Sequence, residues 1–165
     1  MSNSRPDDDG NAVYLIKADE IAAMDGETKI HFLNANAQRI NKSLGDLTGL
    51  TGFGFHLIEV EPGYDTTEYH LHHCEDECVY VLDGEATAFI GDEAFTISPG
   101  DFIGYRKGGL PHSIHNSGNT VLKCIVVGDR LPHDMGDYPK KAKRLYRNAG
   151  MGWDLVDHDA IKKPK

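Results

Sequence analysis

The sequence has few cysteines, few basic residues and no long apolar run, and each shortage excludes a class of protein. Only 3 of the 165 residues are cysteine, an odd number that is too small for a disulfide scaffold. No stretch approaches the roughly 18 apolar residues of a membrane-spanning helix. The first ten residues contain neither the basic nor the apolar segment of a secretion signal. We therefore expect a soluble protein of a reducing cytoplasm.

The shortage of positive charge restricts the partners. The chain has 17 Lys+Arg against 26 Asp+Glu, so its formal net charge is −9. Nucleic acids and anionic membranes are bound by positively charged faces. We expect neither of them as a partner, and instead a small-molecule substrate.

The length suits a single domain, and the composition, 39% hydrophobic and 26% charged, is that of a globular protein. Between Gly52 and Val127, short apolar runs alternate with turn signals rich in Gly, Pro, Asn and Asp. This regular spacing, without helical periodicity between the runs, predicts an all-β sandwich or barrel. The seven predicted strands are Phe53–Val60, Cys78–Leu82, Ala86–Ile90, Ala94–Ile97, Phe102–Arg106, His112–His115 and Val121–Val127.

The sequence predicts three parts: an N-terminal arm (1–42), the barrel (43–128) and a C-terminal extension (129–165) that docks on the barrel or on a partner subunit. In the arm we expect an acidic disordered segment over 1–11, a short strand over 13–16 and a helical turn over 19–24. The polar segment 34–49 is predicted to be loop. Trp153 is interpreted as an apolar anchor for the extension, with a ligand contact as the alternative.

Histidine and carboxylate residues in one segment indicate a metal site. His70 and His72 lie two residues apart, so on a strand they share a face, and Glu77 follows after a short loop. His112, after a Gly-rich turn, is a fourth candidate. Imidazole and carboxylate ligands suit Zn, Mn, Fe, Co or Ni better than Mg or Ca. A zinc finger built from Cys74 and Cys78 with histidines is an alternative that lacks a second ligand pair.

These residues fall into two motifs. The first runs from Gly63 through His70-Leu-His72, four residues, Glu77, six residues and Gly84. The second is Pro99-Gly100-Asp101, Gly108, His112 and, after three residues, Asn116. Over residues 43–138 the chain thereby resembles the cupin family, most of all its small stand-alone bacterial members, some of which are labelled sugar-phosphate isomerases. One departure is a turn from Gly108 to His112 that is one residue longer than usual.

The resemblance implies a double-stranded β-helix, a jelly-roll-like barrel, that binds one divalent metal ion per chain through His70, His72, Glu77 and His112. It also implies a homodimer, often formed by exchange of edge strands. Arg106 is a candidate for holding an anionic substrate group, although an ordinary surface arginine is equally consistent with the sequence. His56 is a candidate substrate contact, with a satisfied core imidazole as the alternative.

The function expected from the residues and the resemblance is metal-dependent chemistry on a small polar or anionic molecule, with sugar-phosphate isomerisation as the most specific hypothesis. Glu77 would then be both a ligand and the catalytic base. An iron or manganese dioxygenase would use the same ligands. A third hypothesis is a non-catalytic module that binds or senses a small ligand.

Overall fold

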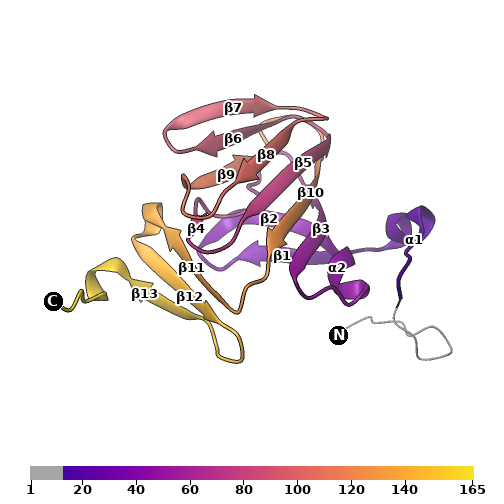
Figure 1. The fold of residues 1–165 in the computed structure, drawn as a ribbon. Helices are drawn as coiled ribbons and strands as arrows, with labels where there is room; N and C mark the ends of the chain where they lie inside the picture. The colour runs from indigo at the N-terminus through magenta and orange to yellow at the C-terminus, as the bar shows by residue number, and fades with distance from the viewer. Residues whose placement is uncertain (1–12) are drawn as a thin grey trace.

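Antiparallel strands make up about half of residues 13–165, the part of the chain that the computed structural model describes (Figure 1). The strands are β1 (Glu27–His31), β2 (Asn34–Ser43), β3 (Phe53–Val60), β4 (Leu71–His72), β5 (Glu77–Asp83), β6 (Ala86–Ile90), β7 (Glu93–Ile97), β8 (Phe102–Tyr105), β9 (His112–His115), β10 (Leu122–Asp129), β11 (His133–Tyr138), β12 (Lys143–Asn148) and β13 (Asp154–Asp157). The helices are α1 (Ala18–Ala23) and α2 (Leu44–Leu47), with 3₁₀ turns η1 (Pro139–Lys141) and η2 (His158–Ala160). None of these helices is long and apolar enough to cross a membrane.

The strands form three sheets, which confirms the predicted all-β barrel. The largest has the order β1-β2-β3-β10-β5-β8, and the second has the order β7-β6-β9. Buried side chains from both sheets pack in one cluster, so the two sheets are the walls of the barrel. The third sheet, β13-β12-β11-β4, lies beside the barrel (Figure 1).

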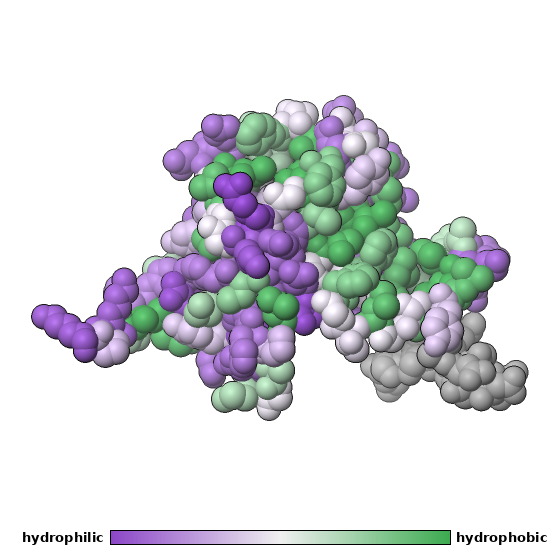
Figure 2. Space-filling model, viewed as in Figure 1, coloured by the Kyte–Doolittle hydropathy of each residue, from purple (hydrophilic) through white to green (hydrophobic). Residues whose placement is uncertain are grey.

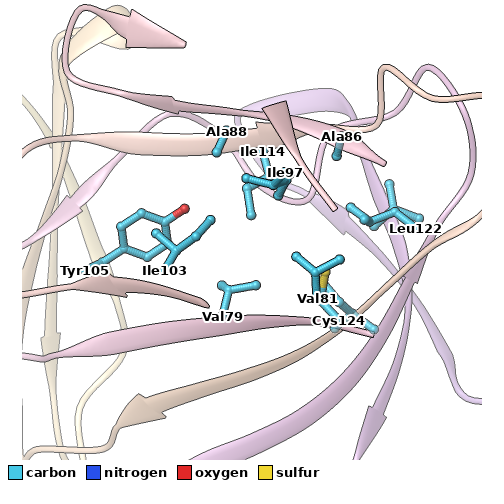
Figure 3. Packing of buried hydrophobic residues seen from close by; sticks show 12 residues of the cluster. Val79, Val81, Ala86, Ala88, Ile97, Ile103, Tyr105, Ile114, Leu122 and Cys124 are labelled. Carbon is cyan, nitrogen blue, oxygen red and sulfur yellow. The ribbon is translucent and has the colours of Figure 1, made fainter. Parts of the chain in front are cut away.

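The apolar core lies between the two walls of the barrel (Figure 3). Val81 and Leu122 of the large sheet are fully buried and face Ala88 and Ile114 of the smaller one. The alternation of strand side chains gives each wall an apolar inner face. A fully buried Leu or Val side chain contributes about 1.5–3 kcal/mol relative to exposure.

The seven strands predicted between residues 52 and 127 are all present, with bounds that coincide or differ by one or two residues. The predictions for the N-terminal part were less accurate. Residues 13–16 form no strand, and Tyr14 is 89% exposed. The predicted helical turn is α1, which begins one residue earlier than Asp19, with the Lys17 N–H donating to the Glu20 carboxylate. The predicted acidic segment over 1–11 lies outside the described residues.

The prediction of a loop over residues 34–49 was wrong. Most of this segment is β2, a ten-residue strand of the large sheet, followed by α2. Its inward face carries Arg39 and Asn41, because this part of the barrel encloses a polar cavity. A strand with polar residues inside has no apolar alternation, which is the signal that identifies strands in a sequence.

The C-terminal part also contains strands that the sequence pattern did not indicate. β11 pairs with β4, with Gly136 opposite His72, and β12 and β13 extend this sheet. β11 thus joins the extension to β4 by backbone pairing, and the docking of the extension on the barrel or on a partner subunit stays a prediction. Within the single chain the Trp153 side chain is 61% exposed, so it is not buried against the barrel of its own chain.

The outer face of the large sheet carries a row of apolar residues. Leu57, Ile125, Tyr80 and Phe102 are successive cross-strand neighbours on β3, β10, β5 and β8. Tyr80 is 44% exposed and Phe102 is 66% exposed. Hydrophobic residues gather over β3, β5 and β10 in Figure 2. This row of side chains is called the outer apolar row below.

Candidate metal centre

Three segments bring the four predicted ligands together. His70 precedes β4, and its backbone forms an isolated antiparallel bridge with His112 at the start of β9. The two residues exchange N–H···O bonds of 3.0 and 2.8 Å, which places their side chains next to each other. Glu77 is the first residue of β5, and His72 ends β4 on the same face as His70.

Three of the four ligand atoms are close enough for one ion. Those of His70, Glu77 and His112 are all within 4.8 Å of one another, whereas His72 belongs to a second group, with Glu75 and Asp134. The Nε2 atoms of His70 and His72 are 3.2 Å apart, and Nε2 of His112 is 3.8 Å from a Glu77 carboxylate oxygen. The longer turn before His112 therefore does not direct this imidazole away from the others.

Hydrogen bonds on the far side of each ring fix which nitrogen is free. Nδ1 of His70 donates to the Glu68 carbonyl at 2.8 Å, and Nδ1 of His112 donates to the Leu110 carbonyl at 3.1 Å. Nδ1 of His72 donates to the Asp134 carboxylate at 2.6 Å. Since carbonyl and carboxylate oxygens only accept, the hydrogen must be on Nδ1.

In the neutral rings the three Nε2 atoms therefore present lone pairs to the centre. Burial lowers the pKa of His70 to about 3, so that this ring is neutral at pH 7. Nε2 of His112 is buried and has no hydrogen-bond partner within the described residues. Converging lone pairs beside a carboxylate are the donor set of a divalent transition metal or zinc, so the residues present fit such an ion. The binding of a metal ion by these residues is a prediction.

Charged residues outside the predicted set support His72. Asp134 of β11 is 4% exposed, and its second oxygen accepts the Cys74 N–H at 3.1 Å. Arg147 of β12 forms an ion pair with buried Glu75 and lies 3.8 Å from Asp134. Sequence reasoning missed Asp134, since a residue 62 positions from His72 gives no local signal. Among the described residues, neither His70, Glu77 and His112 nor the second group of potential metal ligands, His72, Glu75 and Asp134, includes a cysteine.

Tyr105 of β8 stacks on the His112 ring, with centroids 3.5 Å apart and planes nearly parallel at 2°. It lies opposite Glu77 in the β5–β8 pairing. Its hydroxyl is buried without a partner in the described structure and points toward the apolar core (Figure 3). Burial raises the pKa of Tyr105 well above its usual value, so the phenol is neutral. Tyr105 thus separates the candidate metal centre from the core.

A cavity of about 370 Å³ adjoins the imidazoles. This volume is near the lower end of the range of small-molecule sites, about 300–1,000 Å³. Of the described residues that line it, Glu77 alone carries a carboxylate, whereas Lys29, Arg39 and Arg147 are cationic. Aromatic side chains, among them the exposed Trp153, also line the cavity. The cavity can therefore accept a small anionic molecule although the whole chain is acidic.

The two predicted substrate contacts lie in different places. His56 of β3 lines the cavity, and its Nδ1 lies 3.0 Å from the Ser43 hydroxyl and 3.2 Å from the Asn41 amide nitrogen. Arg106 is exposed and does not line this cavity. It borders a second cavity, on the other side of Glu77, with Cys78 and Asp129.

Known proteins resemble this chain in sequence and in structure. Residues 56–128 match the family model described as "Cupin domain". The crystal structure of a protein from Acidithiobacillus ferrooxidans, provisionally named a sugar phosphate isomerase, is 51% identical in sequence. It superposes with a TM-score of 0.88 over 92% of this chain and 96% of that one.

A second crystal structure is that of a protein from Silicibacter pomeroyi, named a sugar phosphate isomerase from a cupin superfamily. It is 26% identical, with a TM-score of 0.74 over 85% of this chain and 93% of that one. Uncharacterized protein MJ1618 of Methanocaldococcus jannaschii is 33% identical over 66 residues, which are 40% of this chain and 52% of that protein. The chain thus spans about half the length of this curated relative.

Proposed function

Because this chain belongs to the cupin superfamily, we propose that it is a metal-dependent enzyme that isomerises a small sugar phosphate. The proposed site contains one divalent ion per chain, held by His70, His72, Glu77 and His112. The names of the two similar crystal structures support the reaction class. The cationic lining of the cavity supports an anionic substrate.

The observation that carries the proposal is the arrangement of the imidazoles. Each of the three donates from Nδ1 to a fixed acceptor, which leaves Nε2 free, and Nε2 of His112 lies 3.8 Å from a Glu77 carboxylate oxygen. Such acceptors orient metal-binding histidines and raise their basicity. When bound, the ion would polarise a substrate carbonyl or hold two substrate oxygens. Three imidazoles and one carboxylate leave positions for those oxygens on a six-coordinate ion.

Isomerisation of a sugar phosphate moves a proton between neighbouring carbons and therefore needs a base beside the substrate. Among the described residues that line the cavity, Glu77 supplies the carboxylate. We therefore assign proton transfer to the Glu77 oxygen that is not engaged as a ligand. The imidazoles are unsuited to this role, because their Nδ1 hydrogens are committed to the acceptors named above.

His31 of β1 is placed to donate a hydrogen bond to substrate. Its Nδ1 accepts the Leu33 N–H at 3.1 Å, so the hydrogen of the neutral ring is on Nε2. Burial, together with the charges of Arg39 and Lys141, lowers the pKa of His31 to about 4. The ring is thus neutral at pH 7, and it lines the cavity. Sequence reasoning missed this residue.

The test is elemental analysis of tag-free protein beside two pairs of variants. We expect about one metal ion per chain in the natural protein and loss of this ion in His72→Ala and Glu77→Ala. The matched controls are His73→Ala and Glu93→Ala, which alter a histidine bonded to Asp137 and an exposed glutamate. Folded natural protein that takes up no metal when it is offered would contradict the proposal.

Activity assays distinguish the reaction classes once the metal is known. Interconversion of aldose and ketose phosphates, abolished by metal removal, is the expected result. Oxygen consumption with an iron- or manganese-loaded protein would support the dioxygenase instead. Ligand binding without turnover would support the non-catalytic module.

A further inference from the structure

One partly buried cation that lines the cavity has no role in the proposed metal centre. Arg39 lies in the middle of β2, and strand alternation places it on the same inward face as Ala37 and Asn41, all of which line the cavity. Its Nη1 donates to the Thr66 carbonyl at 2.5 Å. Its Nε is buried and has no acceptor among residues 13–165.

An unpartnered guanidinium donor inside a protein is unfavourable. A buried donor without an acceptor costs about 1–3 kcal/mol, and more when the group is charged. Burial accordingly lowers the pKa of Arg39, and only the more distant charge of Glu77 opposes this effect. The remaining donors of Arg39 are therefore available to an anion that enters the cavity.

A second cation faces Arg39 across the strand pair. Lys29 of β1 is the direct register partner of Arg39 and lines the same cavity. Like charges at directly opposed positions destabilise a strand pair. Lys29 is 40% exposed and pairs only at 3.5 Å with the exposed Glu27. Two cations on neighbouring strands thus face the cavity without a buried carboxylate between them.

We propose that Arg39, assisted by Lys29, binds the phosphate group of the substrate and so selects phosphorylated sugars over neutral ones. This inference rests on the proposed function, because it assigns the opposite end of the substrate to His70, His72, Glu77 and His112. A guanidinium matches phosphate oxygens with two parallel N–H donors, whereas sugar hydroxyls do not need a full positive charge. Arg106, the arginine that the sequence suggested for this role, is outside the cavity.

The test measures the binding of inorganic phosphate, fructose 6-phosphate and fructose to the metal-loaded full-length chain by isothermal titration calorimetry. Arg39→Gln removes the charge, Arg39→Lys keeps the charge without the paired donors, and Lys29→Gln removes the exposed cation. Arg106→Gln is the matched control, because it removes an exposed arginine beside the same Glu77. Circular dichroism and metal content verify that each variant is folded.

We expect Arg39→Gln to weaken the binding of fructose 6-phosphate and of inorganic phosphate by about tenfold or more, as loss of a charge-assisted hydrogen bond predicts. Arg39→Lys should recover part of the affinity, and Lys29→Gln should cause a smaller loss. Arg106→Gln should leave the affinity unchanged, and fructose should bind equally weakly to every variant. Unchanged phosphate affinity in Arg39→Gln, or an equal loss in Arg106→Gln, overturns the proposal.

Two further measurements separate this proposal from the function on which it rests. Phosphate titrations after removal of metal by EDTA should still show the difference between the natural chain and Arg39→Gln, because the guanidinium binds phosphate without the ion. Loss of the difference would show that phosphate binds the metal and would contradict the role of Arg39. A chain that binds no metal but still shows the Arg39-dependent affinity would contradict the proposed function alone.

Discussion

His72 of β4 donates its Nδ1 hydrogen to Asp134 of β11 at 2.6 Å, and this bond joins the candidate metal centre to the C-terminal sheet. β11 pairs with β4 directly, with Gly136 opposite His72. The C-terminal strands therefore orient one of the four candidate ligands.

Asp134→Asn should weaken metal binding by about 10–100-fold, the usual effect of removing a residue that orients a metal ligand. The amide lacks the negative charge that holds the Nδ1 hydrogen of His72. Competition with a chelator measures the affinity. Asp137→Asn, on the same strand but bonded to His73, is the control and should leave the affinity unchanged. If Asp134→Asn binds metal as tightly as the natural chain, Asp134 does not position His72.

Asn116→Asp should lower the free energy of unfolding by about 3–5 kcal/mol, since it leaves buried polar groups unpaired. The Asn116 amide is fully buried and donates to the carbonyls of Val60 and Thr120 at 2.8 and 2.9 Å. A carboxylate of the same shape has no hydrogen to donate to either. Urea titration measures the difference in the free energy of unfolding between the variant and the natural chain. The exposed Asn119→Asp is the control and should change stability little.

Gly84→Ala should destabilise the barrel more than Gly63→Ala, although both glycines have positive φ, +83° and +85°. A Cβ at Gly84 would lie 2.7 Å from the Val121 carbonyl oxygen, whereas one at Gly63 would have nothing within 4 Å. Gly63→Ala should therefore cost about 1–2 kcal/mol of conformational strain alone. Gly84→Ala should cost more than this, because the backbone at Val121 must also move. Similar melting temperatures for the two variants would contradict this explanation.

The stabilising effect of Asp137 should depend on pH. The hydrogen bond from Arg144, supported by His73 and His158, holds the pKa of Asp137 well below its ordinary value of 3.8. A carboxyl group with a depressed folded-state pKa stabilises fully above its unfolded pKa, and this stabilisation is lost as pH falls through the folded-state pKa. Asp137→Asn should thus lower stability by about 1–3 kcal/mol at pH 7.

Thermal melts of the natural chain and of Asp137→Asn, recorded at a series of pH values, check this expectation. The difference in melting temperature should narrow as the pH falls below about 4, where the Asp137 carboxylate of the natural chain begins to lose its advantage over the unfolded chain. A difference that grows as the pH falls below about 4 would have the wrong sign for a depressed carboxyl pKa.

We further predict a homodimer that covers the outer apolar row, Leu57, Ile125, Tyr80 and Phe102. An exposed apolar surface of this kind is typical of an interaction site. Sedimentation equilibrium should give twice the chain mass of 18.2 kDa. Phe102→Asp should give monomers, whereas the control Leu110→Asp, at an exposed leucine outside the row, should not. A natural chain that remains monomeric at high concentration would refute the prediction.

The sequence by itself determined the barrel and the four candidate ligands. Its seven central strands are short apolar runs, each closed by a local turn signal, and local signals are readable without tertiary structure. The spacing of His70 and His72 likewise follows from strand alternation. Glu77 and His112 were candidates from their residue types and places in the chain, and the family resemblance assigned them matching positions in its two motifs.

Only the tertiary structure decided what surrounds those ligands. β2 was missed because its inward residues, Arg39 and Asn41, face a polar cavity, so the strand has no apolar period. Asp134 was missed because its contact with His72 depends on the pairing of β11 with β4, across 62 positions of chain. Arg106 is close to the motif in sequence, yet strand direction turns it away from the cavity. No local sequence pattern encodes the pairing between distant strands. That pairing determines which cation lines the cavity.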